Sequence, residues 1–409
     1  MKKIYFSFLV PLFLYGQNLE ELVNLTIQNK LVDASKLGIE AQKENYESVK
    51  SGYMPKLDVG AGYSYTEKER TGVAQQAANA YASLNYLLYD GGKKEDVYDS
   101  LKSNIKSDEK SLEALKNDLS LTVVEYYFKY LSLLSQKDAK EQEIEQLEAQ
   151  YKRLNRFFEA GTTTEDEVQK IISRVENANV LLQEIELDIT TILHNLKYLT
   201  GNDVNITKGS KISEIANLDK NLRFDIQALQ ENINSKRSLA NAEKSGYKPT
   251  ITLDNTFSYY DSEYKNSANK ANSFYHQNVA SANLKWNLFS FGETKHKFES
   301  KQKEYLSSVS NFEYEKNKAD IDLELALKAY NIANAKIKSS LSTLNAANSA
   351  YEVIKSKFEN GLIENVAYLE SLSEKFDAAS QYESSLNDLE IKKANIIYHS
   401  GEKIQEYIK

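Results

Sequence analysis

Residues 51–55 read Ser-Gly-Tyr-Met-Pro, and residues 245–249 read Ser-Gly-Tyr-Lys-Pro, so one short stretch occurs twice in this chain. Later landmarks repeat with an offset of 200 residues, including Gly161 with Gly361 and residues 198–201 with 398–401. This period is much longer than the roughly 20–50 residues of solenoid repeats. The sequence therefore predicts one structural module that is present in two copies.

Each copy is predicted to contain a helix, two strands, a very long helix and a final helix. The first copy spans 17–201, and its elements are expected at 18–52, 55–66, 80–90, 92–159 and 164–200. A linker over 202–220 follows. The second copy spans 221–409, and its elements are expected at 221–246, 249–260, 277–290, 293–359 and 363–400.

Proline and glycine mark the boundaries of these elements. Pro55 and Pro249 should each end a helix and start a strand, because proline forces the preceding residue out of the α region. Gly161 and Gly361 fall between the last two helices of each copy, where a residue with positive φ commonly ends a helix. Each copy is therefore predicted to end in a helical hairpin.

The helices carry the heptad pattern of coiled coils. One seam of alternating steps of three and four consists of Val168, Ile171, Val175, Ala178, Leu182, Ile185, Ile189, Ile192, Leu196 and Leu199. A similar seam on the preceding long helix consists of Leu112, Leu115, Leu119, Val123, Tyr126, Tyr130 and Leu133. By themselves these helices are equally compatible with a fibrous coiled-coil structural or surface protein that has no channel activity.

The four predicted strands alternate apolar and polar residues with a period of two. The apolar positions are Leu57, Val59, Ala61, Tyr63 and Tyr65, then Ala80, Ala82, Leu84, Tyr86 and Leu88, then Ile251, Leu253, Phe257 and Tyr259, and finally Ala280, Ala282, Leu284, Trp286 and Leu288. Strands of about 9–11 residues can cross a bilayer, apolar side outward. Because the smallest membrane barrels have about eight strands, four strands must share a barrel with other copies, in a dimer or a trimer.

The first sixteen residues have the pattern of a secretory signal peptide. Lys2 and Lys3 precede an apolar run over 4–15, which is shorter than the about 20 residues of a membrane-spanning helix. Removal of 1–16 would take two lysines from a chain whose net charge is already -8. Such an acidic exported chain does not suit nucleic acid as a partner.

The sequence shows none of the common signs of catalysis. The chain has no cysteine, which excludes disulfides and thiolate chemistry. The four histidines show no metal-ligand spacing, and no phosphate-binding loop, dinucleotide-binding turn or nucleophile elbow is found. We therefore expect no enzyme, no catalytic residue, no metal and no cofactor.

The duplicated order of elements, Ser-Gly-Tyr-x-Pro before the strands and Phe-x-x-Gly at the hairpin ends, resembles the TolC-like outer-membrane efflux proteins, the outer membrane factors. The resemblance implies an α+β membrane protein in which a long coiled-coil α-helical barrel is joined to a transmembrane β-barrel, with four strands per protomer and an internal two-fold sequence duplication. It also implies a homotrimer in the lipid of the cell outer membrane, with its helical tunnel in the periplasm. Such a channel would be the exit duct of a tripartite efflux or type I secretion system, and it would work with a periplasmic adaptor (membrane fusion) protein and, through the adaptor, an inner-membrane pump.

In this family the hairpin ends close the periplasmic aperture and contact the adaptor. The resemblance assigns the adaptor contact to Phe158, Gly161, Thr164, Phe358, Gly361 and Glu364. It assigns the aperture to Glu165, Asp166, Glu167 and Glu370. Family members often carry a carboxylate six residues after the hairpin glycine, which gives Glu167 in the first copy but Ala367 in the second. The simpler interpretation is that a helix N-terminus favours acidic residues.

Overall fold

The fold comes from a computed structural model, which describes residues 16–214, 220–266 and 276–409. The expected signal peptide lies outside the described residues, apart from Gly16. The chain forms two compact units. One, here called the helical unit, contains Met1–Ser35, Leu112–Phe224 and Lys316–Lys409, and the other, the sheet unit, contains Lys36–Ser111 and Asp225–Glu315.

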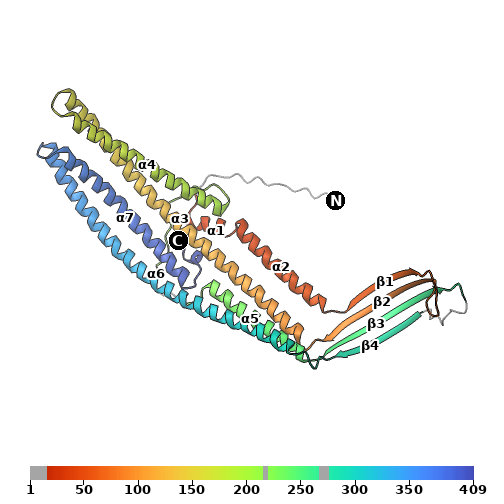
Figure 1. The fold of residues 1–409 in the computed structure, drawn as a ribbon. Helices are drawn as coiled ribbons and strands as arrows, with labels where there is room; N and C mark the ends of the chain where they lie inside the picture. The colour runs from red at the N-terminus through yellow and green to blue at the C-terminus, as the bar shows by residue number, and fades with distance from the viewer. Residues whose placement is uncertain (1–15, 215–219, 267–275) are drawn as a thin grey trace. The chain divides into compact units, whose positions relative to one another are not determined.

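The helical unit is built from two long antiparallel hairpins (Figure 1). The first hairpin joins α3 (Lys93–Glu159) to α4 (Glu165–Thr200), and the second joins α6 (Glu293–Glu359) to α7 (Asn365–His399). The short elements α1 (Leu19–Thr26) and η3 (Ile404–Tyr407) complete it. Figure 1 shows the long helices in the order α4, α3, α7, α6, so α4 and α6 lie at the two edges.

Two hydrophobic clusters hold the hairpins together. All ten predicted seam positions of α4 belong to these clusters, either as buried members or as side chains packed against them. On α3 the predicted seam residues Tyr126 and Tyr130 pack against one cluster as partly buried side chains. Tyr127 and Phe128, which the pattern left out of the seam, are fully buried. The Tyr127 hydroxyl donates a hydrogen bond of 2.8 Å to the carbonyl of Thr207, which satisfies its polar atom inside the core.

The helix expected over 18–52 is wrong as a single element, because it divides into α1 and α2 (Lys30–Gly52). Asn18 and Glu21 form a reciprocal capping box that starts α1. Asn29 separates the two helices: its Oδ1 accepts from the backbone of Val32 at 3.0 Å, and its Nδ2 donates to the carbonyl of Leu199 at 3.0 Å. The apolar periodicity of the sequence continues across Asn29, so this pattern did not indicate that one helix ends and another begins there.

The sheet unit contains most of α2, the N-terminal parts of α3 and α6, α5 (Phe224–Glu243) with the short helix η1 (Lys244–Tyr247), and one antiparallel sheet. The strands are β1 (Lys56–Tyr65), β2 (Gln76–Tyr89), β3 (Thr250–Glu263) and β4 (His276–Lys285), paired in the order β1-β2-β3-β4.

Two strand boundaries differ from the predicted ones, because pairing with the neighbouring strands determines where each strand begins and ends. The second strand begins at Gln76 rather than residue 80, because Gln76 pairs with both Tyr65 and Glu263. The fourth ends at Lys285 rather than residue 290, because its partner strand begins opposite it at Thr250. Trp286 and Leu288 therefore lie beyond β4, contrary to the prediction.

The register brings the apolar positions of all four strands onto one face of the sheet. Leu57 pairs with Leu84, and Val59 pairs with Ala82, which pairs in turn with Phe257. Ile251 pairs with Leu284 on the same face. A register irregularity after Leu87 ends this regular alternation on β2 near Leu88.

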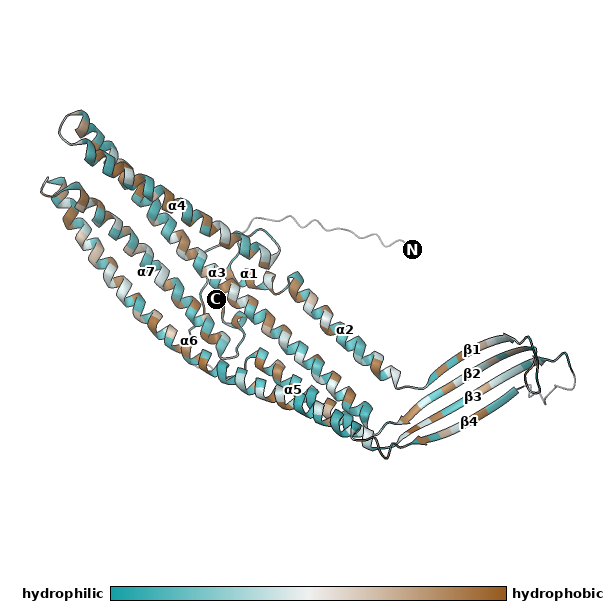
Figure 2. Cartoon of the chain, in the orientation of Figure 1, coloured by the Kyte–Doolittle hydropathy of each residue, from teal (hydrophilic) through white to brown (hydrophobic). Residues whose placement is uncertain are grey.

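The helices carry hydrophilic and hydrophobic residues interspersed along their length (Figure 2). Within the described residues, no helix combines the length and the apolar character that a membrane-spanning helix requires.

Candidate functional site

Both hairpins turn through the same backbone motif. The amide of Gly161 donates to the carbonyl of Phe158 at 2.9 Å, and the amide of Thr162 donates to that of Phe157 at 2.8 Å. The equivalent bonds of the second hairpin are both 2.9 Å. Gly161 and Gly361 have φ values of 70° and 71°. These features define a Schellman motif, in which a left-handed residue lets two otherwise unpaired carbonyls of the helix end accept hydrogen bonds.

The first hairpin presents its acidic residues beside a lysine. Glu165, Asp166 and Glu167 form the first turn of α4. One turn later, Lys170 donates to Asp166 at 3.1 Å and to Glu167 at 2.8 Å. Lys170 was missed in the sequence, although its spacing of three and four residues from these acids is the usual sign of helical ion pairs. It offsets part of the negative charge at this hairpin end.

Hydrogen bonds stabilise the ionised form of the Asp166 carboxylate. The Thr164 side chain, and then Lys170, hold the pKa of Asp166 below its ordinary value. Favourable hydrogen bonds to the charged form have this effect because they would be weakened by protonation.

The second hairpin differs from the first in its charges. Glu364 precedes α7 as its N-cap residue, and the first turn of α7 contains no acidic residue. Glu370 lies further along α7, where its Oε1 is 3.9 Å from the guanidinium of Arg174 on α4. Glu370 thus lies in an ion pair between the two hairpins and not in the first turn of α7.

The two phenylalanines that occupy equivalent sequence positions have different surroundings. Phe158 is 42% exposed. Phe358 stacks on Tyr368 with ring centroids 4.7 Å apart, and the guanidinium of Arg153 lies 5.0 Å from the Phe358 ring. Arg153 belongs to the first hairpin, so this cation–π contact joins the two hairpins near their ends.

Buried polar groups also join the hairpins. Gln150 of α3 donates to the Oδ1 of Asn365 at 2.8 Å, and both side chains are buried. The Nδ2 of Asn365 has no hydrogen-bond partner.

Burial, followed by the hydrogen bond with Tyr351, raises the pKa of Tyr368, so its hydroxyl remains protonated under ordinary conditions.

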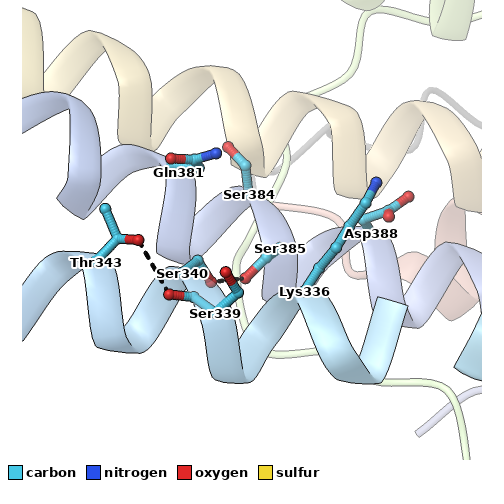
Figure 3. Close-up of a pocket in the computed structure, with 8 residues that line it drawn as sticks. All are labelled: Lys336, Ser339, Ser340, Thr343, Gln381, Ser384, Ser385 and Asp388. Atoms are coloured by element: carbon cyan, nitrogen blue, oxygen red, sulfur yellow. Dashed lines mark hydrogen bonds between the residues drawn. The ribbon is translucent and has the colours of Figure 1, made fainter. Parts of the chain in front are cut away.

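A polar pocket of about 430 Å³ lies between α6 and α7 (Figure 3). Its lining residues are Lys336, Ser339, Ser340, Thr343, Gln381, Ser384, Ser385 and Asp388. Ser340 and Ser385 share a hydrogen bond of 2.8 Å across the two helices. This buried serine pair interrupts the apolar packing between the two helices.

The described residues contain no group of three or more histidine, aspartate or glutamate side chains placed to hold a metal ion.

The apolar face of the sheet is exposed. Val59 is 80% exposed, Leu57 is 69% exposed and Leu284 is 66% exposed. On the opposite face, Asn283 donates to Asp254 at 3.0 Å, and Gly60 leaves room for the ring of Tyr81. An exposed apolar face of this extent marks contact with another apolar medium or partner.

Comparison with known proteins agrees with this architecture. The family model described as "Outer membrane efflux protein" matches the chain twice, over residues 22–202 and 217–401. The outer membrane protein TolC of Vibrio cholerae is 22% identical over 414 residues, which cover 93% of this chain and 91% of that protein.

Solved structures share the fold. A membrane protein from Pseudomonas aeruginosa superposes with a TM-score of 0.83 at 18% identity, covering 94% of this chain and 93% of the other. The CmeC outer membrane channel of Campylobacter jejuni gives a TM-score of 0.82 at 19% identity, covering 94% of this chain and 85% of the other.

Proposed function

This chain belongs to the outer membrane efflux protein family, and from that premise we propose that it forms the passive exit duct of a tripartite efflux or type I secretion system. Cargo would pass from an inner-membrane pump and a periplasmic adaptor through the duct to the exterior. The observation that carries the proposal is the sheet, in which the register of four strands gathers an exposed apolar face opposite a polar one.

The apolar face suits lipid, and the polar face suits a water-filled lumen. Transmembrane barrels alternate lipid-facing and lumen-facing residues in this way. In one chain β1 and β4 form the two edges of the sheet. Their unpaired backbone groups cannot be left exposed to hydrocarbon, so the strands of several copies must close one barrel. We propose a homotrimer in the outer membrane.

The helical hairpins would form a periplasmic tunnel whose outer ends meet the adaptor. Exposed Phe158, together with Leu362, which is 72% exposed, offers apolar contact at the hairpin ends. The tight turns at Gly161 and Gly361 would present these side chains, with Thr164 and Glu364 beside them. Phe358 would act indirectly, since it packs within the second hairpin.

The acidic residues would surround the periplasmic aperture. Glu165, Asp166 and Glu167 of each copy would come together at the end of the tunnel, where carboxylates favour cations. Lys170 and Arg174 offset part of this negative charge through their ion pairs. Glu370 would add negative charge near the aperture, where it pairs with Arg174. We infer further that the two halves of the chain are copies of one module, which the two matches to a single family model support.

Channel formation can be tested with purified protein in planar lipid bilayers. We expect a detergent-stable trimer that inserts and conducts ions, with cation preference. A soluble helical oligomer that gives no conductance would refute the duct and favour the fibrous coiled-coil protein. Adaptor contact can be tested separately by cross-linking at Phe158 in cells that carry the adaptor.

A further inference from the structure

Gln17 is held at three points by the segment that follows α4. Its backbone N–H donates to the carbonyl of Asn205 at 2.6 Å, and its carbonyl accepts from the amide of Thr207 at 2.9 Å, which makes a parallel bridge to Ile206. The amide of Asn205 also donates to the side-chain Oε1 of Gln17 at 3.0 Å. The backbone nitrogen and the side-chain carboxamide of Gln17 are therefore both bound by Asn205.

Gln17 is also the residue that signal cleavage would expose. The sequence predicts a signal peptide over 1–16, and cleavage of such a leader requires a small residue before the cut, which Gly16 supplies. Backbone hydrogen bonds hold the chain just after this point, because the amides of Asn18 and Leu19 both donate to side chains. Gln17 would thus be an N-terminal residue that the fold already binds.

We propose that cleavage between Gly16 and Gln17 is followed by cyclisation of Gln17 to pyroglutamate. The freed α-amino nitrogen attacks Cδ of its own side chain, so the N–Cδ bond forms and the Cδ–Nε2 bond breaks. One proton of the amine passes to the leaving nitrogen, which departs as ammonia. The step changes no oxidation state and needs no second reactant.

The hydrogen bonds to Asn205 favour this reaction by bringing its two groups together. The amide and the carbonyl of one residue are separated only by its Cα atom. To reach both, the side chain of Gln17 folds back toward its own nitrogen instead of extending away from it. Holding two reacting groups close to each other lowers the barrier to their reaction.

The cyclised product also suits the backbone of Asn205. In a trans peptide bond the carbonyl of Gly16 points away from the N–H of Gln17, so the acceptor for the Asn205 amide comes from the Gln17 side chain. The lactam ring of pyroglutamate fixes its own N–H and C=O on the same side. One rigid group can then donate to the carbonyl of Asn205 and accept from its amide, without the entropic cost of ordering an open side chain.

Cyclisation would also remove the charge from the end of the chain. A free α-amino group has a pKa of about 7.7–8.0 and is mostly charged at neutral pH, whereas the lactam is neutral. The neighbouring residues Leu19 and Ile206 belong to the hydrophobic core, beside which a neutral group is less costly than a charged one. The lactam also lacks the free amine that aminopeptidases require.

The modification can be tested on mature protein purified from the outer membrane. Primary amines of the folded protein are dimethylated before digestion, so that cyclisation during digestion is not counted. We expect the N-terminal peptide to begin at residue 17, to carry no label on its α-nitrogen and to be lighter than the encoded peptide by the mass of one ammonia. A labelled glutamine at residue 17, or a chain that begins at any other residue, would overturn the proposal.

Gln17→Asn is the matched control for the chemistry. It keeps a carboxamide, but its side chain is one methylene shorter and cannot close the same ring. The N-terminus of this variant should be fully labelled and should show no loss of ammonia. If the loss persists in Gln17→Asn, the reacting group is not the side chain of Gln17, and the assignment is wrong.

Hydrogen exchange tests whether the ring binds Asn205. The Asn205 amide should exchange several-fold faster in Gln17→Ala than in the wild type, because alanine offers no side-chain acceptor. The Thr207 amide should remain equally protected in both, since it donates to the backbone carbonyl of residue 17. Equal exchange at Asn205 in the two proteins would overturn the binding of the ring. Neither experiment measures conduction, so their failure would leave the proposed duct unaffected.

Discussion

At the scale of single residues, the two hairpin glycines combine a strict backbone requirement with open surroundings. Both adopt positive φ, and a Cβ atom at either position would meet no atom within 4 Å. Substitution therefore tests the backbone alone. Gly361→Ala should destabilise its turn by about 1–2 kcal/mol, the cost of left-handed backbone for a residue with a side chain.

Hydrogen exchange of the amides around the second hairpin turn would measure this effect. Gly38→Ala is the matched control, because Gly38 lies inside α2, also with open surroundings and without positive φ. That change should stabilise its helix by about 0.5–1 kcal/mol. Unchanged exchange at the turn in Gly361→Ala would contradict the backbone argument.

The charge pattern of the first hairpin makes a prediction about pH. The pKa of Asp166 is lowered in the folded chain, so its contribution to stability is present above its unfolded pKa and is lost as pH falls through the folded one. Lys170→Met should raise the pKa of Asp166, so the loss of this contribution to stability should occur at higher pH. Titration of the carboxyl carbon by NMR would show the shift, and Thr164→Val should act in the same direction.

The sequence predicted some residue-level features of this site and not others. Gly161 and Gly361 were correctly placed at helix ends, since few other residues tolerate that backbone. The different surroundings of Phe158 and Phe358 could not be predicted, because Arg153 and Tyr368 reach Phe358 from other helices. The pairing of Glu370 with Arg174 likewise depends on how the two hairpins pack.

At the scale of elements, the sheet provides the sharpest prediction. Ala280 and Val279 are neighbours on β4 that lie on opposite faces, since Ala280 pairs with Asn255 and Val279 with Thr256. Ala280→Lys should reduce the yield of membrane-inserted trimer, because a lysine facing lipid near the bilayer midplane costs about 2–4 kcal/mol. Val279→Lys should assemble normally. Equal yields from outer-membrane fractions would show that the faces are wrongly assigned.

Element boundaries were predictable where local chemistry determines them. Pro55 and Pro249 precede strands as expected, because their effect on the preceding residue is local. The division of α1 from α2 and the end of β4 were not predictable, since they depend on Asn29 meeting Leu199 and on Lys285 facing Thr250. These contacts join segments that are distant in sequence.

At the scale of the whole molecule, the proposed aperture links charge to conduction. Glu167→Gln removes one of the two carboxylates that Lys170 contacts and should make the aperture less attractive to cations. Single-channel recordings should then show lower cation preference with an unchanged trimer yield. Glu176→Gln is a suitable control, because that residue is exposed further along α4. Equal selectivity in both variants would exclude Glu167 from the aperture.

The two open edges of the sheet also govern how fast the channel can form. In each newly exported copy the outer edges of β1 and β4 have no partner strand, so productive insertion must wait for an encounter with other copies. The formation rate should therefore rise more steeply than linearly with the surface density of protomers, whereas a barrel made by one chain would insert at a rate proportional to density. At low expression, unassembled copies should accumulate and become targets for periplasmic proteases before they can form a channel.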